Sequence, residues 1–161
     1  MRPSDIEAIV RLERVCQPLP WSASAFATEI GNPNAYYAVA KTDEGQVVGY
    51  GGIWVVMDEL HVTTLGSEPA LRGRKIGEKL LLLLLEQGIR MGATRATLEV
   101  RATNVAAIKL YIKYKFAEVS VRRAYYSDNK ENALIMWAEE IASPEYRAFL
   151  ADRELALSEL Q

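Results

Sequence analysis

Apolar and polar positions alternate along this chain with two different periods, and the changes of period divide it into helices and strands. Apolar residues three or four positions apart indicate amphipathic helices, whereas apolar residues at every second position indicate strands. The expected helices cover residues 4–16, 22–30, 76–91, 104–114 and 143 onward, and the expected strands cover residues 36–41, 47–56, 61–65, 95–100, 117–125 and 132–137. This order predicts an α/β protein in which helices flank one mixed central sheet.

Residues that favour helix ends and bends support these boundaries. Ser4 and Glu7 have the spacing of a capping box, and Ser22 is expected to cap the second helix. Three glycines within residues 49–52 predict a bend or bulge in the second strand.

The helix expected over residues 76–91 is apolar on all sides, and such a helix is usually buried on more than one flank. The sheet can cover one flank. The other can be covered by the C-terminal helix, whose apolar residues are Tyr146, Phe149, Leu150, Leu157 and Leu160, although this helix could equally pack against a second subunit. We therefore expect one domain over residues 1–142 and a helical extension over residues 143–161.

Composition narrows the function classes. The chain has 161 residues, half of them hydrophobic, and a net charge of −2, which fits one globular domain and gives no basic field for nucleic acid. Its single cysteine and single histidine exclude a disulfide framework and a histidine-rich metal site. The N-terminus has no signal-peptide core, and the leucines at 80–85 are far fewer than the roughly 20 apolar residues that span a bilayer. These observations predict a cytoplasmic protein that contacts neither nucleic acid nor a membrane and needs no metal.

The most distinctive stretch is residues 60–87, where a β-branched strand leads through a basic turn, residues 72–75, into the leucine-rich helix. A helix N-terminus presents unpaired N–H groups and the positive end of a dipole, so an anion is expected there. The stretch predicts a site for the pyrophosphate of a nucleotide-like cofactor. The alternative is a charged turn that is merely solvated.

Several blocks of this chain resemble the GNAT acetyltransferases. Residues 72–77 (RGRKIG) are similar to the acyl-CoA signature R/Q-x-x-G-x-G/A of that superfamily. Residues 98–104 (LEVRATN) with 107–111 (AIKLY) resemble the LEVRxSN…AIxLY block of the bacterial ribosomal-protein alanine N-acetyltransferases, and residues 19–22 (LPWS), 122–126 (RRAYY) and 131–136 (ENALIM) resemble further blocks of that group. The resemblance covers roughly residues 4–138.

The resemblance implies the GNAT fold, a mixed sheet whose fourth and fifth strands splay apart to admit acetyl-CoA. Here those strands are residues 61–67 and 95–100. The implied acetyl-CoA contacts are the backbone at Leu65 and Ser67 for the pantetheine arm and thioester, and the amides of Arg74, Lys75, Ile76 and Gly77 for the pyrophosphate. Arg72, Gly73 and Asn104 are further implied cofactor contacts.

Two lysines depart from the family pattern. Lys75 replaces the first glycine of the acyl-CoA signature, and Lys115 replaces the glycine that follows the tyrosine-containing helix. Glycine at such positions often has positive φ, and a left-handed lysine costs on the order of 1 kcal/mol. The Lys75 charge suits a phosphate, although the side chain can crowd it.

Acetyl transfer to an amine needs a base for the ammonium and an acid for the departing thiolate. Glu99 is the candidate base, and its apolar strand pattern predicts partial burial that would raise its pKa toward neutrality. Tyr111, on the following helix, is the candidate acid. The alternatives are that Glu99 is only an outward-facing strand residue and that Tyr111 is a core tyrosine.

A hydrophobic and aromatic set is expected to wall the peptide entrance, with ordinary packing as the alternative. Its members are Leu19, Pro20, Trp21, Tyr125 and Tyr126. His61 is expected to be a structural strand residue. Cys16 is expected to be a small buried residue without a nucleophilic role.

The favoured hypothesis is an enzyme that transfers acetyl from acetyl-CoA directly to a protein N-terminal α-amine in a ternary complex. By resemblance, the substrate is the N-terminal alanine of a small-subunit ribosomal protein. The enzyme is expected to be a monomer or a weak homodimer. Two alternatives remain open. One is an acyl-CoA-binding or interaction module with weak or lost catalysis, and the other is an acetyltransferase for lysine side chains or a small amine.

Overall fold

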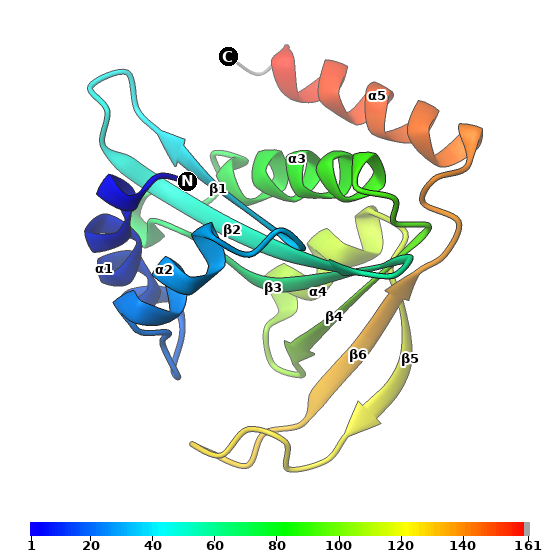
Figure 1. The fold of residues 1–161 in the computed structure, drawn as a ribbon. Helices are drawn as coiled ribbons and strands as arrows, with labels where there is room; N and C mark the ends of the chain where they lie inside the picture. Colours follow the sequence, from blue (N-terminus) through cyan, green and yellow to red (C-terminus); the bar gives the residue numbers. More distant parts are fainter. Residues whose placement is uncertain (160–161) are drawn as a thin grey trace.

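Across residues 1–159, the part of the chain that the computed structural model describes, six strands form one mixed sheet in the order β1-β2-β3-β4-β6-β5 (Figure 1). The strands are β1 (Ala35–Lys41), β2 (Val47–Val56), β3 (Glu59–Ser67), β4 (Arg95–Arg101), β5 (Ala117–Arg122) and β6 (Ala133–Ala138), and the helices are α1 (Ile6–Cys16), α2 (Ala23–Ile30), α3 (Ile76–Arg90), α4 (Val105–Lys113) and α5 (Pro144–Ser158). The predicted α/β class and the order of elements are confirmed. Leu160, expected on the apolar face of the last helix, lies outside the described residues.

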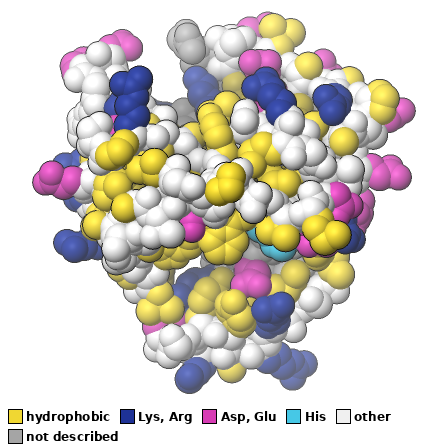
Figure 2. Space-filling model, viewed as in Figure 1, with side chains coloured by type: hydrophobic (Ala, Val, Ile, Leu, Met, Phe, Trp, Pro, Cys, Tyr) yellow, Lys and Arg dark blue, Asp and Glu magenta, His cyan; other side chains and the backbone are white. Residues whose placement is uncertain are grey.

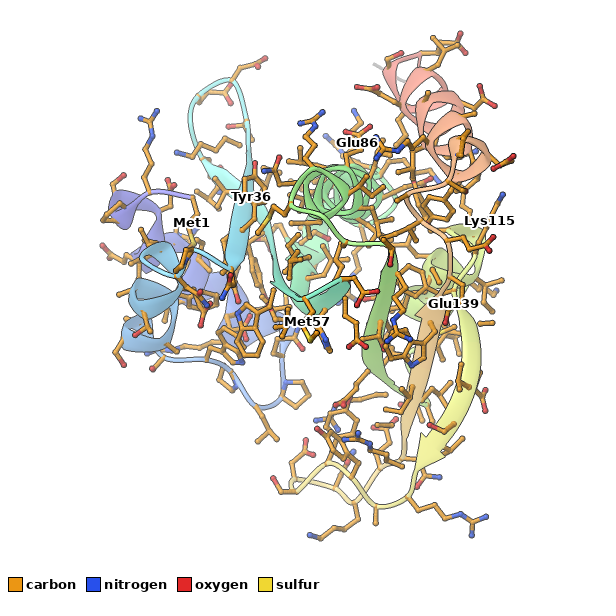
Figure 3. All side chains as sticks on the ribbon, turned by 45° about the vertical axis from the view of Figure 1, so that its right-hand side comes forward. Met1, Tyr36, Met57, Glu86, Lys115 and Glu139 are labelled. Atoms are coloured by element: carbon orange, nitrogen blue, oxygen red, sulfur yellow. The ribbon has the colours of Figure 1, made fainter. Side chains whose placement is uncertain are left out.

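Two hydrophobic clusters hold the layers together, one on each face of the sheet. On one face, α3 packs over β1, β2 and β3, and its leucines join the main core (Figure 3). On the other face, α1 and α2 cover β1 and β2 through Ile9, Leu12 and Phe26, which are at most 1% exposed. The helices therefore enclose the first three strands, and this fixes the position of β3 beside the candidate site.

The leucine-rich helix α3 is buried on two flanks, as predicted. Gly88 of α3 lies so close to β3 that an added Cβ would come within 2.0 Å of the Leu60 side chain. On its other flank, α5 contributes Tyr146, Leu150 and Leu157 to the same core. The C-terminal helix therefore packs within its own chain. Among the helices of residues 1–159, none is both long and apolar enough to cross a membrane.

The parallel strands β3 and β4 pair only near their starts. Their register consists of Glu59 with Arg95, Leu60 with Ala96, and His61 with Thr97. No further pairs follow along the described parts of these two strands, so they diverge toward Ser67 and Arg101. The predicted splay between the fourth and fifth family strands is confirmed.

Some predicted boundaries were wrong. The capping box at Ser4 does not form, because a 3₁₀ turn precedes α1 and the Asp5 carboxylate accepts a hydrogen bond from the Arg2 N–H at 2.7 Å. The strand expected over residues 117–125 ends at Arg122, so Tyr125 and Tyr126 lie in the following loop. In contrast, the Ser22 hydroxyl accepts from the Ala25 N–H at 3.2 Å, which confirms that cap, and a register shift after Gly52 confirms the bulge in β2.

Candidate active site

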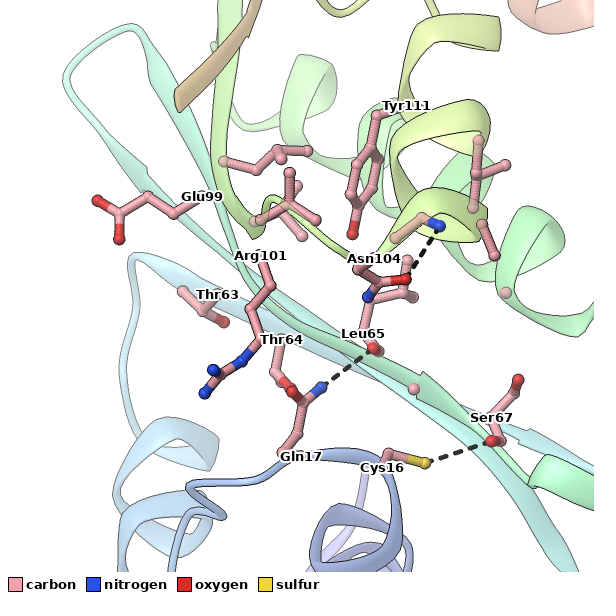
Figure 4. A pocket seen from close by; sticks show the side chains of 18 of the residues that line it. Cys16, Gln17, Thr63, Thr64, Leu65, Ser67, Glu99, Arg101, Asn104 and Tyr111 are labelled. Carbon is pink, nitrogen blue, oxygen red and sulfur yellow. Dashed lines mark hydrogen bonds between the residues drawn. The ribbon is translucent and has the colours of Figure 1, made fainter. Parts of the chain in front are cut away.

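A cavity of about 1300 Å³ opens where β3 and β4 separate (Figure 4). Small-molecule pockets are usually about 300–1,000 Å³, so this cavity has room for two substrates side by side. Of the predicted site residues, its lining includes Leu19, Trp21, Leu65, Ser67, Arg72, Gly73, Lys75, Ile76, Gly77, Glu99, Asn104, Tyr111, Tyr125 and Tyr126. Pro20 and Arg74 are not part of the lining, whereas Pro18 is.

The basic turn before α3 has the backbone of a glycine-rich loop. Gly73 has φ +84°, and Lys75 caps α3 in the left-handed conformation at φ 64°, as expected for a position where the signature has glycine. The Arg74 N–H is taken up by the Leu71 carbonyl at 3.3 Å, so this amide does not face an anion. The Lys75 ammonium lies 3.5 Å from the Glu78 carboxylate, which draws it onto the first turn of the helix.

Glu78 is the centre of a buried ionic cluster behind this turn. Its side chain is 4% exposed and lies 2.6 Å from the Lys113 ammonium of α4 and 3.0 Å from the Arg153 guanidinium of α5. The Tyr114 hydroxyl donates to the same oxygen at 3.3 Å. Burial alone would raise the pKa of Glu78, but the bonds from Lys113 and Arg153 outweigh it and hold that pKa below its ordinary value. Helices α3, α4 and α5 therefore meet at one carboxylate.

The edge of β3 that faces the opening is in contact with the end of α1. The Leu65 carbonyl accepts from the Gln17 side-chain amide at 3.4 Å, and the Ser67 carbonyl accepts from the Cys16 thiol at 3.3 Å (Figure 4). Burial raises the pKa of the Cys16 thiol, so it stays protonated near neutral pH and is a poor nucleophile. Cys16 is half-buried and borders the cavity, whereas it was predicted to be buried.

Glu13 connects the entrance loop to the sheet, a role that the sequence did not reveal. It is 1% exposed, and its carboxylate accepts hydrogen bonds from the Trp21 N–H at 3.2 Å and the Thr64 hydroxyl at 3.3 Å. The sequence feature that could have indicated this role is the position of Glu13, an acidic residue within the apolar stripe of the first helix. Through these bonds Trp21 is held at the mouth of the cavity.

The Glu99 side chain borders the cavity but is not buried. It is 35% exposed, and its carboxylate lies 3.2 Å from the Arg122 guanidinium. The neighbouring Glu99 carboxylate raises the pKa of the Tyr125 phenol. The expectation of partial burial was wrong, because this face of β4 looks onto the open space left by the splay. An exposed carboxylate can still accept a proton from an amine brought into the cavity, directly or through water.

Tyr111 projects from α4 into the cavity from the opposite side (Figure 4). Its side chain is also part of the core, at 8% exposed, and burial raises its pKa to about 12. It therefore remains a neutral hydroxyl donor throughout the physiological range. Asn104 caps this helix, since its side-chain oxygen accepts from the Ala107 N–H at 3.3 Å, as predicted for a helix N-cap.

The loop after β5 forms a wall that is fixed to β4 by Arg101. The Arg101 guanidinium lies 3.8 Å from the Tyr126 ring centre and 3.1 Å from the Asp128 carboxylate. Glu131 of the same loop bonds to Thr103, and this hydrogen bond lowers the pKa of Glu131 to about 2. Tyr125 packs edge-on against Tyr126 and is 44% exposed toward the entrance.

The chain is similar to known acetyltransferases in sequence and in fold. The Acetyltransferase (GNAT) family profile matches residues 6–116. The chain is 39% identical over 138 residues to the putative ribosomal protein bS18-alanine N-acetyltransferase of Bacillus subtilis, covering 85% of this chain and 91% of that protein. It is 32% identical over 138 residues to the ribosomal protein bS18-alanine N-acetyltransferase of Escherichia coli, covering 84% of this chain and 92% of that protein. The crystal structure of the Escherichia coli ribosomal-protein-S18-alanine N-acetyltransferase superposes with a TM-score of 0.78 at 29% identity, covering 87% of this chain and 90% of that one.

Proposed function

This chain belongs to the GNAT acetyltransferase family, and we propose that it acetylates the N-terminal α-amine of a protein, specifically the N-terminal alanine of a small-subunit ribosomal protein. The single observation that carries the mechanism is that one cavity contains the turn at the start of α3, the carboxylate of Glu99 and the hydroxyl of Tyr111. A ribosomal substrate agrees with the cytoplasmic location expected from the sequence.

Acetyl-CoA supplies the activated acetyl thioester in this proposal. The N–H groups of Lys75, Ile76 and Gly77 at the start of α3 would bind its diphosphate, because a helix N-terminus with a glycine-like entry favours an anion. The edge of β3 at Leu65 and Ser67 faces the opening and would line the pantetheine arm. Lys75 does not prevent this, since its ammonium is paired with Glu78.

Glu99 is the proposed base and Tyr111 the proposed acid. Glu99 accepts a proton from the acceptor ammonium, which is easier for an α-amine, with a pKa of about 7.7–8.0, than for a lysine at about 10.4. Tyr111 donates its proton toward the sulfur as the carbon–sulfur bond breaks, and its raised pKa of about 12 keeps it protonated until that moment. Cys16 takes no part as an acyl carrier, because its thiol stays protonated and bonded to Ser67.

The acceptor enters on the side of the cavity opposite α3. That side is bordered by Leu19, Trp21, Tyr125 and Tyr126. The Trp21 N–H bonds to Glu13, and the Tyr126 ring lies against the Arg101 guanidinium. Their apolar faces suit a short extended segment of chain.

The test is mass spectrometry of three reactions with acetyl-CoA: an alanine-first peptide, the same peptide with a blocked N-terminus and an internal lysine, and no peptide. Acetylation of the alanine α-amine is the expected result. Product only on the lysine would point to a lysine acetyltransferase. Tight binding of acetyl-CoA in calorimetry with no product on either peptide would point to a binding module.

A further inference from the structure

All three tryptophans of the chain line the cavity, and two of them belong to a row that crosses the sheet. Trp54 of β2 is in register with His61 of β3, His61 with Thr97 of β4, and Thr97 with Trp137 of β6. Residues in register on neighbouring strands project from the same face. This face also carries Glu99, two positions after Thr97, since alternate residues of a strand share a face.

The polar atoms of this row are largely engaged by neighbours. The Trp54 indole N–H donates to Glu29 at 2.7 Å, the His61 imidazole lies 3.2 Å from Glu59, and the Thr97 hydroxyl donates to a backbone carbonyl at 3.0 Å. The Arg95 guanidinium covers one side of the Trp137 ring at 5.0 Å and is paired with Glu59. What the row offers to the cavity is therefore mainly aromatic ring surface, with Trp54 36% exposed.

The row lies at the base of the splay, next to the proposed acetylation point. Two strand positions separate Thr97 from Glu99, which is a distance of about 7 Å. An extended acceptor chain advances about 3.4 Å per residue, so the side chain of its second or third residue reaches the row. The row is continuous with the entrance, because the Trp21 and Trp54 rings lie 6.4 Å apart. Figure 2 shows hydrophobic side chains in a hollow beside the histidine.

We propose that Trp54, His61 and Trp137 form a subsite that binds a large apolar side chain, preferably aromatic, at the second or third position of the acceptor protein. This inference rests on the proposed function and adds a substrate preference to it. A flat side chain would bury one face against the ring surface of the row without leaving a buried polar group unpaired.

The experiment compares alanine-first peptides that differ only at position 2 or 3, with Gly, Leu, Phe or Glu there. The wild-type enzyme should show a kcat/KM at least about tenfold higher for Phe than for Gly at one of the two positions, since burial of such a side chain is worth at least that factor. Trp54→Ala and Trp137→Leu should bring this ratio close to one. Both variants should keep the wild-type KM for acetyl-CoA, so the change is confined to the acceptor side.

Val56→Ala is the matched control, because Val56 follows Trp54 on β2, is 51% exposed and does not line the cavity. It should retain the full Phe preference. A wild-type ratio near one at both positions, or a ratio that survives both tryptophan substitutions, would overturn the subsite. If no alanine-first peptide is acetylated, the proposed function fails. The subsite is then tested separately, by calorimetric measurement of peptide binding in the presence of CoA. The Phe peptide must then bind more tightly than the Gly peptide to the wild type but not to Trp54→Ala.

Discussion

Replacing Glu78 with glutamine should destabilise the fold by about 2–3 kcal/mol. The carboxylate is 4% exposed and binds Lys113 at 2.6 Å and Arg153 at 3.0 Å. A hydrogen bond to a charged group is worth about 1.5–3 kcal/mol. Two such bonds sum to about 3–6 kcal/mol. The expected loss lies at or just below the lower end of this range, because the two cations are 37% and 26% exposed and can turn to water, and because glutamine keeps one acceptor oxygen. At roughly 2–4 °C per kcal/mol for a chain of this size, Tm should fall by roughly 4–12 °C.

The stability that Glu78 contributes should depend on pH. The pKa of Glu78 in the folded protein lies below the ordinary 4.5, so its contribution to stability is present above that pH and is lost as the pH falls through the folded pKa. The gap in Tm between wild type and Glu78→Gln, measured by calorimetry, should therefore close in acid.

Glu86→Gln is the control on the same helix. Burial, with Glu154 nearby, raises the pKa of Glu86, so this carboxylate favours the folded state only when it is protonated. Its replacement should leave Tm at neutral pH unchanged or higher. The account of this cluster would be refuted if Glu78→Gln had the same Tm as the wild type at neutral pH, or if the difference in Tm were undiminished at acid pH.

Two further predictions concern the acid and the left-handed residues. Tyr111→Phe should lower kcat by roughly 10²–10⁴-fold with an unchanged KM for acetyl-CoA, and a pH–rate profile of the wild type should show no loss from Tyr111 ionisation until the pH approaches its pKa of about 12. An unaltered kcat would remove its role. Met57→Gly should raise Tm by roughly 2–4 °C, because Met57 has φ 57° and is 91% exposed, and relief of this backbone strain is worth about 1 kcal/mol. Lys115→Gly, at φ 67°, should gain less, since it also removes the contact of the ammonium with the Phe149 ring at 4.5 Å. Equal gains in thermal melts would contradict that difference.

Local pattern was sufficient to predict most of the fold. The apolar run Val47–Val56, which follows a turn, predicted the bounds of β2, and the glycines within it marked its bulge. Lys75 and Lys115 stand where the family pattern has glycine, and this predicted a left-handed backbone at both positions. Both residues have positive φ. Such features depend on residues close in sequence, whose conformations follow from local sterics.

Other features depended on tertiary contacts that no local pattern contains. The alternation of apolar and polar residues in β4 predicted the face on which Glu99 lies. It could not predict that the separation of β3 and β4 leaves this side chain exposed. Arg153 and Glu78 are 75 positions apart, so their pairing became visible only when α5 was seen against α3. Likewise, the alignment of Trp54 with Trp137 requires the order of four strands.

The proposed mechanism rests on the side chain at position 99 receiving the proton of the acceptor amine. The decisive measurement is the initial rate at which Glu99→Gln acetylates the α-amine of an alanine-first peptide at saturating acetyl-CoA, followed by mass spectrometry. Glu118→Gln serves as the control, because Glu118 is exposed on β5 outside the cavity. The account predicts a rate roughly 10²–10⁴-fold below wild type for the first variant and an undiminished rate for the second. Near-normal turnover by Glu99→Gln would contradict it.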